Sequence, residues 1–343
     1  MLMSKAETRN RTASTVDARD VLVVVPTLNE AAHIETCLRS LLEGDQQVRD
    51  IPVVVADGGS TDRTVEIVTA LQAEFPNLRV LHNPKRLQAA ALNLAVAEHG
   101  EAARYLVRCD AHSIYPPDFI IAVVAQLAAT GAASVVVPMD AIGHTCFEKA
   151  NAWIVDTKLG SGGAAHRAGK ASGYVDHGHH AGFDLDMYRR IGGYDERFSH
   201  NEDAEYDYRV TAAGGRIYMD ADIRIQYIPR ASVPRLARQY FNYGKGRARN
   251  ILKHGGRLKL RQALPILTFL ACLIGLIGGT FFTPALILPS GYVALLLGAS
   301  LVMAVRKASV CGLLTGLASG TMHMSWAAGF LVQSLRGYEA TGR

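Results

Sequence analysis

The sequence lacks the two glycine-rich signatures that identify most phosphate-binding loops. No apolar, strand-like run is followed by Gly-x-Gly-x-x-Gly, and none by Gly-x-x-x-x-Gly-Lys-Ser/Thr. The first pattern is typical of dinucleotide-binding Rossmann domains and the second of P-loop NTPases. Both classes are therefore weakly supported, and a nucleotide site in this chain has to be built from other residues.

Cysteine is scarce and unpaired in the sequence. Five cysteines stand at positions 37, 109, 146, 272 and 311, and no two form a Cys-x-x-Cys pair. Structural zinc sites and disulfide frameworks need cysteines that are clustered or regularly spaced. We therefore expect neither, and scattered thiols fit a protein of a reducing compartment. Residues 1–15 lack the apolar core of a signal peptide, so we expect residues 1–18 to be a disordered leader.

Acidic residues are missing from one long segment. Between residues 230 and 261 there are ten lysines and arginines but no aspartate or glutamate, with aromatic residues at 240, 241 and 243. Such a segment suits nucleic acid or an anionic membrane surface. Apolar runs follow directly at residues 263–282, 285–305 and 310–335, so the membrane surface is the better interpretation and no nucleic-acid partner is expected.

Each of these three runs is long enough to cross a bilayer. A hairpin of the first two would place Arg306 and Lys307 on the cytoplasmic side, beside the rest of the chain, as the positive-inside rule requires. The third run either spans or lies along the interface, and a buried helical domain is the alternative. The chain is expected to divide into the leader, a catalytic domain (19–229), a basic interfacial segment (230–262), transmembrane helices (263–335) and a tail (336–343).

Residues 21–107 show a regular alternation of strand-like and helix-like segments. Residues 21–25, 51–56 and 105–107 are short apolar runs, residues 78–82 are a further strand-like segment, and helical patterns lie between them at 31–42, 62–71 and 88–98. With 49% hydrophobic and 20% charged residues, the chain of 343 residues can bury a large core. The pattern predicts an α/β fold with a doubly wound, mostly parallel sheet.

Polar motifs follow these strands at the edge where open α/β sheets bind ligands. The first is Pro26-Thr27-Leu28-Asn29-Glu30, the second begins at Asp57, the third strand is followed by Lys85 and Arg86, and the fourth by Asp110 and His112. The first two offer acceptors for a base and ribose, and the cations suit a diphosphate. Asp110 and His112 point the same way in an extended segment, so they predict a Mg²⁺ or Mn²⁺ site. Ordinary turns and helix caps are the alternative for each motif.

These motifs resemble those of family 2 glycosyltransferases of the GT-A fold. The resemblance covers about residues 21–249 and rests on Pro26–Glu30, Asp57–Asp62, Asp110-Ala111-His112 and Asn201-Glu202-Asp203, in this order. It implies that the first segments hold the nucleotide, that Asp110 and His112 lie at the metal, and that Asp203 is the catalytic base. The sequence departs from the family at His112, where an aspartate is usual; imidazole tolerates Mn²⁺ better than Mg²⁺.

Two further groups of candidate residues follow from the same resemblance. His179, His180 and Glu202 are expected near the sugar and the acceptor, behind a mobile loop at 160–173, although a structural turn or a separate metal is open for the histidines. Lys245 and Arg247 stand where processive relatives carry Gln-x-x-Arg-Trp, and they are expected at the diphosphate. The motif itself is absent, which favours the addition of a single sugar.

The resemblance therefore implies an inverting enzyme that adds one sugar, expected to be glucose from a UDP-sugar in β-linkage, to a saccharide on a polyprenyl diphosphate during exopolysaccharide synthesis. We expect it at the bacterial inner membrane, with the catalytic domain facing the cytoplasm. A processive polysaccharide synthase is one alternative. An inactive protein that binds nucleotide sugar or lipid is the other, because His112 departs from the family pattern.

Overall fold

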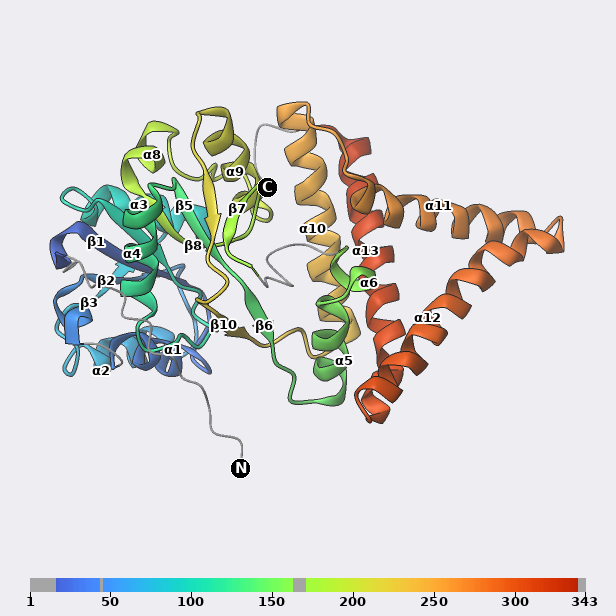
Figure 1. Ribbon diagram of the computed structural model, residues 1–343, viewed down its shortest axis with the longest axis horizontal. Helices are drawn as coiled ribbons and strands as arrows, with labels where there is room; N and C mark the ends of the chain where they lie inside the picture. The colour runs from blue at the N-terminus through green and yellow to red at the C-terminus, as the bar shows by residue number, and fades with distance from the viewer. Residues whose placement is uncertain (1–16, 44–45, 163–170, 339–343) are drawn as a thin grey trace.

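The computed structural model describes residues 17–43, 46–162 and 171–338 (Figure 1). A sheet of eight strands in the order β3-β2-β1-β4-β8-β5-β9-β7 forms its centre. These strands are β1 Val21–Thr27, β2 Val53–Asp57, β3 Leu78–His82, β4 Tyr105–Arg108, β5 Ser134–Val137, β7 Gly173–Val175, β8 His179–Asp184 and β9 Ile217–Met219. Strands β1 to β4 are parallel, whereas β8 runs antiparallel to β4 and β5. The prediction of a mostly parallel α/β sheet is confirmed.

Both faces of this sheet are buried, as the continuous apolar strands require. Alternate residues of β1 point to opposite faces, so that Val23 belongs to one core and Val24 to the other. The first core is covered by α1 Ile34–Leu42, α2 Thr64–Leu71 and α4 Phe119–Thr130. The second is covered by α3 Gln88–His99, α8 Leu185–Arg190 and α9 Glu202–Ala212. The carboxyl ends of β1, β2 and β4 remain open at one edge.

A second sheet, β6 Met139–Ala141 with β10 Ile225–Tyr227, connects this domain to a helical region. That region contains α5 Cys146–Val155, α6 Lys158–Ser161, α10 Val233–His254, α11 Leu260–Gly279, α12 Ile287–Arg306 and α13 Thr315–Arg336. Short 3₁₀ turns join α11 to α12 (η3, Thr283–Leu286) and α12 to α13 (η4, Val310–Leu314). Helices α10 and α13 lie side by side, with α10 between α13 and the eight-stranded sheet (Figure 1).

Helices α10 and α13 approach each other through glycines. A side-chain carbon on Gly244 would stand 2.0 Å from the carbonyl oxygen of Trp326, and one on Gly329 would stand 2.0 Å from the carbonyl oxygen of Phe241. Backbones come this close only where no side chain intervenes. The contact therefore depends on glycine at both crossing points.

We expect Gly329→Ala to separate α10 from α13 and to lower the free energy of unfolding by about 1–3 kcal/mol, the usual cost of overpacking. Thermal unfolding of the purified protein in detergent measures this. Gly298→Ala is the matched control, because a side chain added at Gly298, on α12, meets no atom within 4 Å. Equal melting temperatures for the two variants would contradict the close crossing.

Helices α11 and α12 form a V that projects away from α10 and α13 (Figure 1). Among the described residues, these are the two helical segments long and apolar enough to cross a membrane, and only 11% of the most apolar window of each is buried. The core helix of a soluble protein would be mostly buried, so this exposure argues for lipid around the hairpin. Apolar side chains more than half exposed include Leu264, Leu267, Ile274, Ile277, Phe281, Leu297 and Leu301.

The third apolar run behaves differently. Helix α13 packs along α10 and α5, and it buries Ala318, Met322 and Ala327. It lies along α10, on the side away from the eight-stranded sheet (Figure 1), and it is not one of the two candidate membrane spans among the described residues. The expected leader and tail fall almost wholly outside the described residues, as does the greater part of the expected loop at 160–173.

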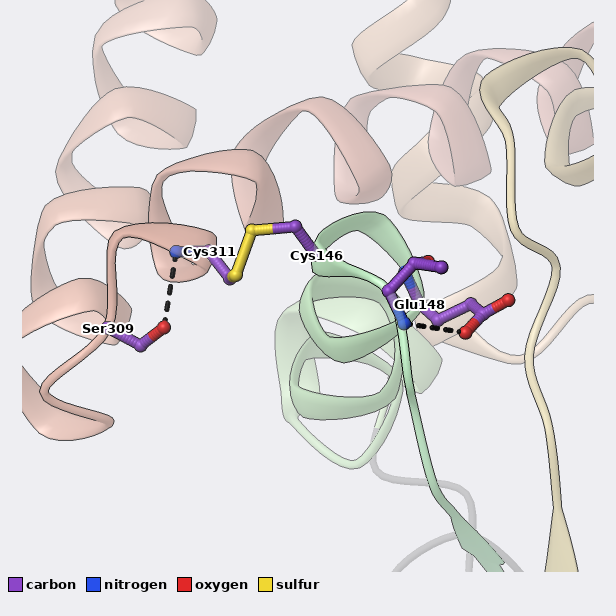
Figure 2. Close-up of a disulfide and its surroundings, with 5 residues drawn as sticks. Cys146, Glu148, Ser309 and Cys311 are labelled. Carbon is purple, nitrogen blue, oxygen red and sulfur yellow. Dashed lines mark hydrogen bonds between the residues drawn. A yellow bond between two sulfur atoms is a disulfide. The ribbon is translucent and has the colours of Figure 1, made fainter.

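The expectation of no disulfide is wrong for one pair of cysteines. Cys146, in the first turn of α5, is bonded to Cys311 in η4, 165 residues later (Figure 2). The bond ties α5 to the segment that follows the apolar hairpin, and it removes the support that unpaired thiols gave to a reducing compartment. Sequence spacing cannot reveal such a pair, because it arises only where α5 packs against η4. Cys37, Cys109 and Cys272 are free.

Candidate functional site

A crevice of about 250 Å³ opens at the carboxyl ends of β1, β2 and β4. The strand-end motifs of β1 and β4 meet there, and the loop before α3 closes one side. Its lining residues are Pro26, Thr27, Leu28, Glu30, Ala56, Asn83, Arg86, Leu87, Gln88, Ala91, Asp110, Ala111 and His112. Six of the residues predicted from sequence to bind nucleotide or metal therefore share one cavity.

The buried side chain of Arg108 connects two carboxylates of the site. Arg108 is the last residue of β4, only 5% exposed, and its guanidinium reaches Asp110 Oδ1 (Nη2, 3.3 Å) and Asp203 Oδ1 (Nη1, 2.6 Å). Burial raises the pKa of Asp110, but the charge of Arg108 outweighs this and holds it below its ordinary value. One buried cation thus joins the carboxylate after β4 to the carboxylate that begins α9.

Asp203 is held by one of its two oxygens. Oδ1 accepts hydrogen bonds from Arg108 and, at 2.8 Å, from the hydroxyl of Tyr194, and it lies 3.3 Å from His180 Nδ1. No described residue donates to Oδ2, and the side chain is 18% exposed. Despite the opposing effect of burial, Arg108 and His180 hold the pKa of Asp203 well below its ordinary value, so the carboxylate is ionised at neutral pH.

Glu202 precedes it in the first turn of α9 and has a different environment. Its carboxylate has no hydrogen-bond partner or ion pair among the described side chains. Burial, reinforced by the negative charge of Asp203, raises the pKa of Glu202 to about 7. The two adjacent carboxyl groups therefore differ in protonation near neutral pH, as is typical of functional sites.

His180 lies behind these carboxylates rather than at their open side. It is 1% exposed, and its ring contacts Asp207 Oδ1 through Nε2 (2.7 Å) and the hydroxyl of Tyr194 through Nδ1 (2.6 Å). Burial alone would lower the pKa of His180, but Asp207 and Asp203 raise it to about 9. The positively charged imidazolium of His180 thus stabilises the negative charge of Asp203 from the buried side. The sequence predicts His180 near the sugar and the acceptor, whereas its ring is buried next to Asp203.

The raised pKa of His180 predicts a pH-dependent stability. A histidine has a pKa near 6.5 in the unfolded chain, so the stabilisation is complete below about pH 6.5 and is lost as pH rises through about 9. We expect the free energy of unfolding to decrease across this interval by on the order of a few kcal/mol. The melting temperature should fall accordingly. His180→Gln should flatten the dependence, and an equally steep fall in that variant would assign it to other groups.

His179 and His112 are the imidazoles nearest to Asp110. His179 Nε2 stands 3.5 Å from Asp110 Oδ2, while His112 Nδ1 is hydrogen-bonded to Glu30 Oε1 at 3.2 Å. The hydrogen bond that its ring donates to the Glu30 carboxylate raises the pKa of His112. Asp110 and His112 both line the crevice, as predicted from their spacing, and His179 approaches Asp110 from β8.

Other predicted nucleotide contacts are engaged in local structure. Asn29 has a left-handed backbone (φ 57°), and its side-chain oxygen accepts from the amide of Thr61 at 2.8 Å. Asp57 accepts from the amides of Gly59 and Ser60 at 2.8 and 2.9 Å. The contact of Asn29 joins the loops that follow β1 and β2, whereas those of Asp57 lie within the second loop. Neither residue is among those that line the crevice.

Of the four predicted cations, one lines the crevice. Arg86 lines the crevice, but Lys85 is paired with Glu196. Lys245 and Arg247 lie on α10, which packs against the beginning of α9 through a hydrogen bond from Asn201 Nδ2 to the carbonyl of Tyr243 (2.9 Å). Burial lowers the pKa of Arg247.

Sequence reasoning missed Arg108 and Tyr194 as site residues. A signal existed for Arg108, because an arginine directly after a buried strand and before Asp110 requires a partner. No local signal pointed to Tyr194, whose hydroxyl reaches Asp203 only because the segment after α8 folds back onto α9. Gln88, which donates to Asp110 Oδ1 at 3.2 Å, was also missed.

A nucleotide-sized crevice flanked by paired carboxylates on a mostly parallel sheet defines the class of protein. Residues 22–192 match the model of Glycosyl transferase family 2. The chain is 44% identical over 312 residues to the succinoglycan biosynthesis protein ExoA of Rhizobium meliloti (strain 1021), covering 90% of this chain and 93% of that relative. The chain belongs to glycosyltransferase family 2.

More distant relatives extend the same picture. A dolichyl N-acetyl-alpha-D-glucosaminyl phosphate 3-beta-D-2,3-diacetamido-2,3-dideoxy-beta-D-glucuronosyltransferase of Methanococcus voltae is 24% identical over 247 residues, 68% of this chain and 74% of that one. Among solved structures, the mannosyltransferase PcManGT from Pyrobaculum calidifontis, in complex with GDP-Man and Mn²⁺, superposes with a TM-score of 0.58 at 21% identity, over 92% of this chain and 87% of that chain. This likeness shows that the GT-A fold is shared.

The donor set at Asp110 fits a divalent ion that is shared with a substrate. No cluster of three or more potential protein ligands occurs among the described residues. Mg²⁺ and Mn²⁺ in nucleotide sites commonly take one or two protein ligands and complete their coordination with phosphate oxygens and water. Asp110 Oδ2, with His179 or His112 beside it, supplies such a partial set.

Proposed function

We propose that the protein transfers a single sugar from a UDP-sugar to a saccharide carried on a polyprenyl diphosphate, during exopolysaccharide synthesis. The observation that carries this proposal is the arrangement of Asp203, which is anchored by Oδ1 and open at Oδ2, next to a crevice that ends at Asp110. The kinship with a succinoglycan biosynthesis protein supports the pathway, and glucose is the sugar that we propose.

The donor is proposed to lie in the crevice. The first strand-end loop, from Pro26 to Glu30, would face the base and ribose, and Arg86 would reach the diphosphate from the opposite wall. Asp110, with His112 or His179, would hold Mg²⁺ or Mn²⁺. When bound, such an ion withdraws charge from the diphosphate and so makes it a better leaving group.

Asp203 is proposed to take the proton from the attacking hydroxyl. The hydroxyl oxygen forms the new glycosidic bond, the bond from the sugar to the diphosphate breaks with its electron pair, and the proton moves to Oδ2. Arg108, Tyr194 and His180 hold the carboxylate in place through Oδ1. Attack on the face opposite the diphosphate inverts the anomeric centre, so an α-linked donor gives a β-linked product.

The apolar hairpin is proposed to hold the catalytic domain at the cytoplasmic face of the inner membrane. No charged residue lies between Arg261 and Arg306, and burying a charge in lipid would be costly. The basic helix α10 would then face anionic headgroups. This places the crevice near the height of a lipid-linked acceptor.

The test is an assay of UDP release across UDP-sugars, with and without Mn²⁺ and with and without an acceptor, for which we choose one simple saccharide, galactose, on a polyprenyl diphosphate. Release that depends on the acceptor, with a product one sugar longer, supports the proposal. A ladder of long products would favour a processive synthase instead, and no release with any donor would favour an inactive binding protein.

A further inference from the structure

A second cavity lies outside the crevice, between the basic helix and the apolar hairpin. It is an open groove of about 450 Å³ formed by α10, α11 and α13. Its walls are apolar, with Ala237 and Phe241 from α10, Phe269 from α11, and Met324 and Ala328 from α13. Arg238 stands at its edge as the sole charged member of the lining among the described residues.

Arg238 and Lys245 are two cations on one face of α10, and Lys245 lies farther from the groove. Arg238 is exposed, and neither it nor Lys245 forms an ion pair with a described carboxylate. The two residues are seven positions apart, which is about two turns or 10 Å along the helix, and they lie on the same face. Asn242, between them on that face, contacts His200 Nε2 at 3.3 Å.

This face of α10 leads to the proposed catalytic carboxylates. His200 is followed by Asn201, Glu202 and Asp203, and Asn201 is hydrogen-bonded to the carbonyl of Tyr243. Gly246 packs so closely on His200 that an added side-chain carbon would stand 2.4 Å from its carbonyl oxygen. The beginning of α9 is therefore fixed to the stretch of α10 that carries Lys245, about two turns from the groove.

We propose that this groove binds the isoprenoid chain of the acceptor, with Arg238 and Lys245 holding its diphosphate and thereby presenting the sugar to Asp203. The inference rests on the proposed function, which it deepens by locating the acceptor. Apolar walls suit a hydrocarbon chain, and a cation at the edge suits the phosphate that such a chain carries. Because α11 supplies one wall, the groove is continuous with the surface of the lipid-exposed hairpin, from which the chain enters.

The experiment fills the groove and compares two acceptors. Ala328→Trp places an indole among the apolar walls. Steady-state kinetics are measured with the same galactosyl diphosphate on a long polyprenyl chain and on a short, water-soluble alkyl chain. We expect KM for the long-chain acceptor to rise at least tenfold, with kcat, KM for UDP-sugar and KM for the short-chain acceptor unchanged.

Arg238→Ala tests the charged edge. We expect it to raise KM about five- to tenfold for both acceptors, because both carry the diphosphate. Arg257→Ala is the matched control, since Arg257 belongs to the same basic segment but does not line the groove, and its KM values should equal those of the wild type. A wild-type KM for the long chain in Ala328→Trp would overturn the assignment, as would equal increases for both acceptors in that variant.

Binding without catalysis separates this inference from the proposed function. A diazirine placed on the polyprenyl chain should cross-link to α10 or α13 at the groove, as mapped by mass spectrometry, and Ala328→Trp should suppress this label. If the groove is labelled but the protein transfers no sugar, the assignment of the groove to the isoprenoid chain would stand and the proposed transferase activity would be refuted. Active transfer with labels only elsewhere, or equal labelling by a diazirine phospholipid in the presence of the acceptor, would refute the groove.

Discussion

Asp203→Asn is expected to lower the rate of sugar transfer by about 10²–10⁴-fold, the usual contribution of a general base. Asparagine has nearly the same shape, so its side-chain oxygen can keep the hydrogen bonds that Arg108 and Tyr194 donate to Oδ1. Its amide nitrogen would then stand where Oδ2 is open, and it cannot accept a proton. Acceptor-dependent UDP release measures the loss, and calorimetric titration with UDP should show unchanged nucleotide affinity.

Glu202→Gln is the informative companion to this variant. Glu202 is the neighbouring residue in the first turn of α9, but burial and the charge of Asp203 raise its pKa to about 7, so its protonation changes near neutral pH. We expect a smaller loss of rate and a change in the pH dependence of kcat around neutrality. If Glu202→Gln abolished transfer while Asp203→Asn retained it, the roles of the two carboxylates would have to be exchanged.

Chelation of divalent ions is expected to reduce transfer by about 10³-fold or more. A metal ion at a leaving diphosphate contributes several kcal/mol, and each tenfold in rate corresponds to about 1.36 kcal/mol. Activity should return when Mn²⁺ is added after removal of EDTA. Full turnover in EDTA would exclude a metal-dependent mechanism.

Asp110→Asn should lower the transfer rate as chelation does, because it removes a proposed ligand of the metal ion. An amide oxygen is a weaker ligand than a carboxylate, so Mn²⁺ should no longer increase the affinity for UDP in a calorimetric titration. Asp186→Asn is the control, because Asp186 is 88% exposed on α8 and far from the crevice in the fold. Equal Mn²⁺-dependent UDP affinity in wild type and Asp110→Asn would remove Asp110 from the proposed metal site.

Local patterns in the sequence were sufficient to predict the sheet and the edge at which the site lies. The apolar runs at 21–25 and 51–56 became β1 and β2, because a strand buried on both faces must be apolar throughout. The polar residues after such strands had to meet at one edge, since parallel strands end together. Asp110 and His112 therefore share the crevice with Glu30, as their positions in sequence indicated.

Only the tertiary structure decided how these residues are held. The link from Arg108 to Asp203 spans 95 residues, and the burial of His180 against Asp207 depends on α9 packing over β8. Likewise, α13 is as long as a membrane span, yet glycines let it dock on α10, while the bond from Cys146 to Cys311 depends on η4 reaching α5. Hydrophobic periodicity records which face of an element is buried, but not which element covers it. For that reason the sequence by itself determined the elements and the edge that carries the motifs, and packing alone determined the partners.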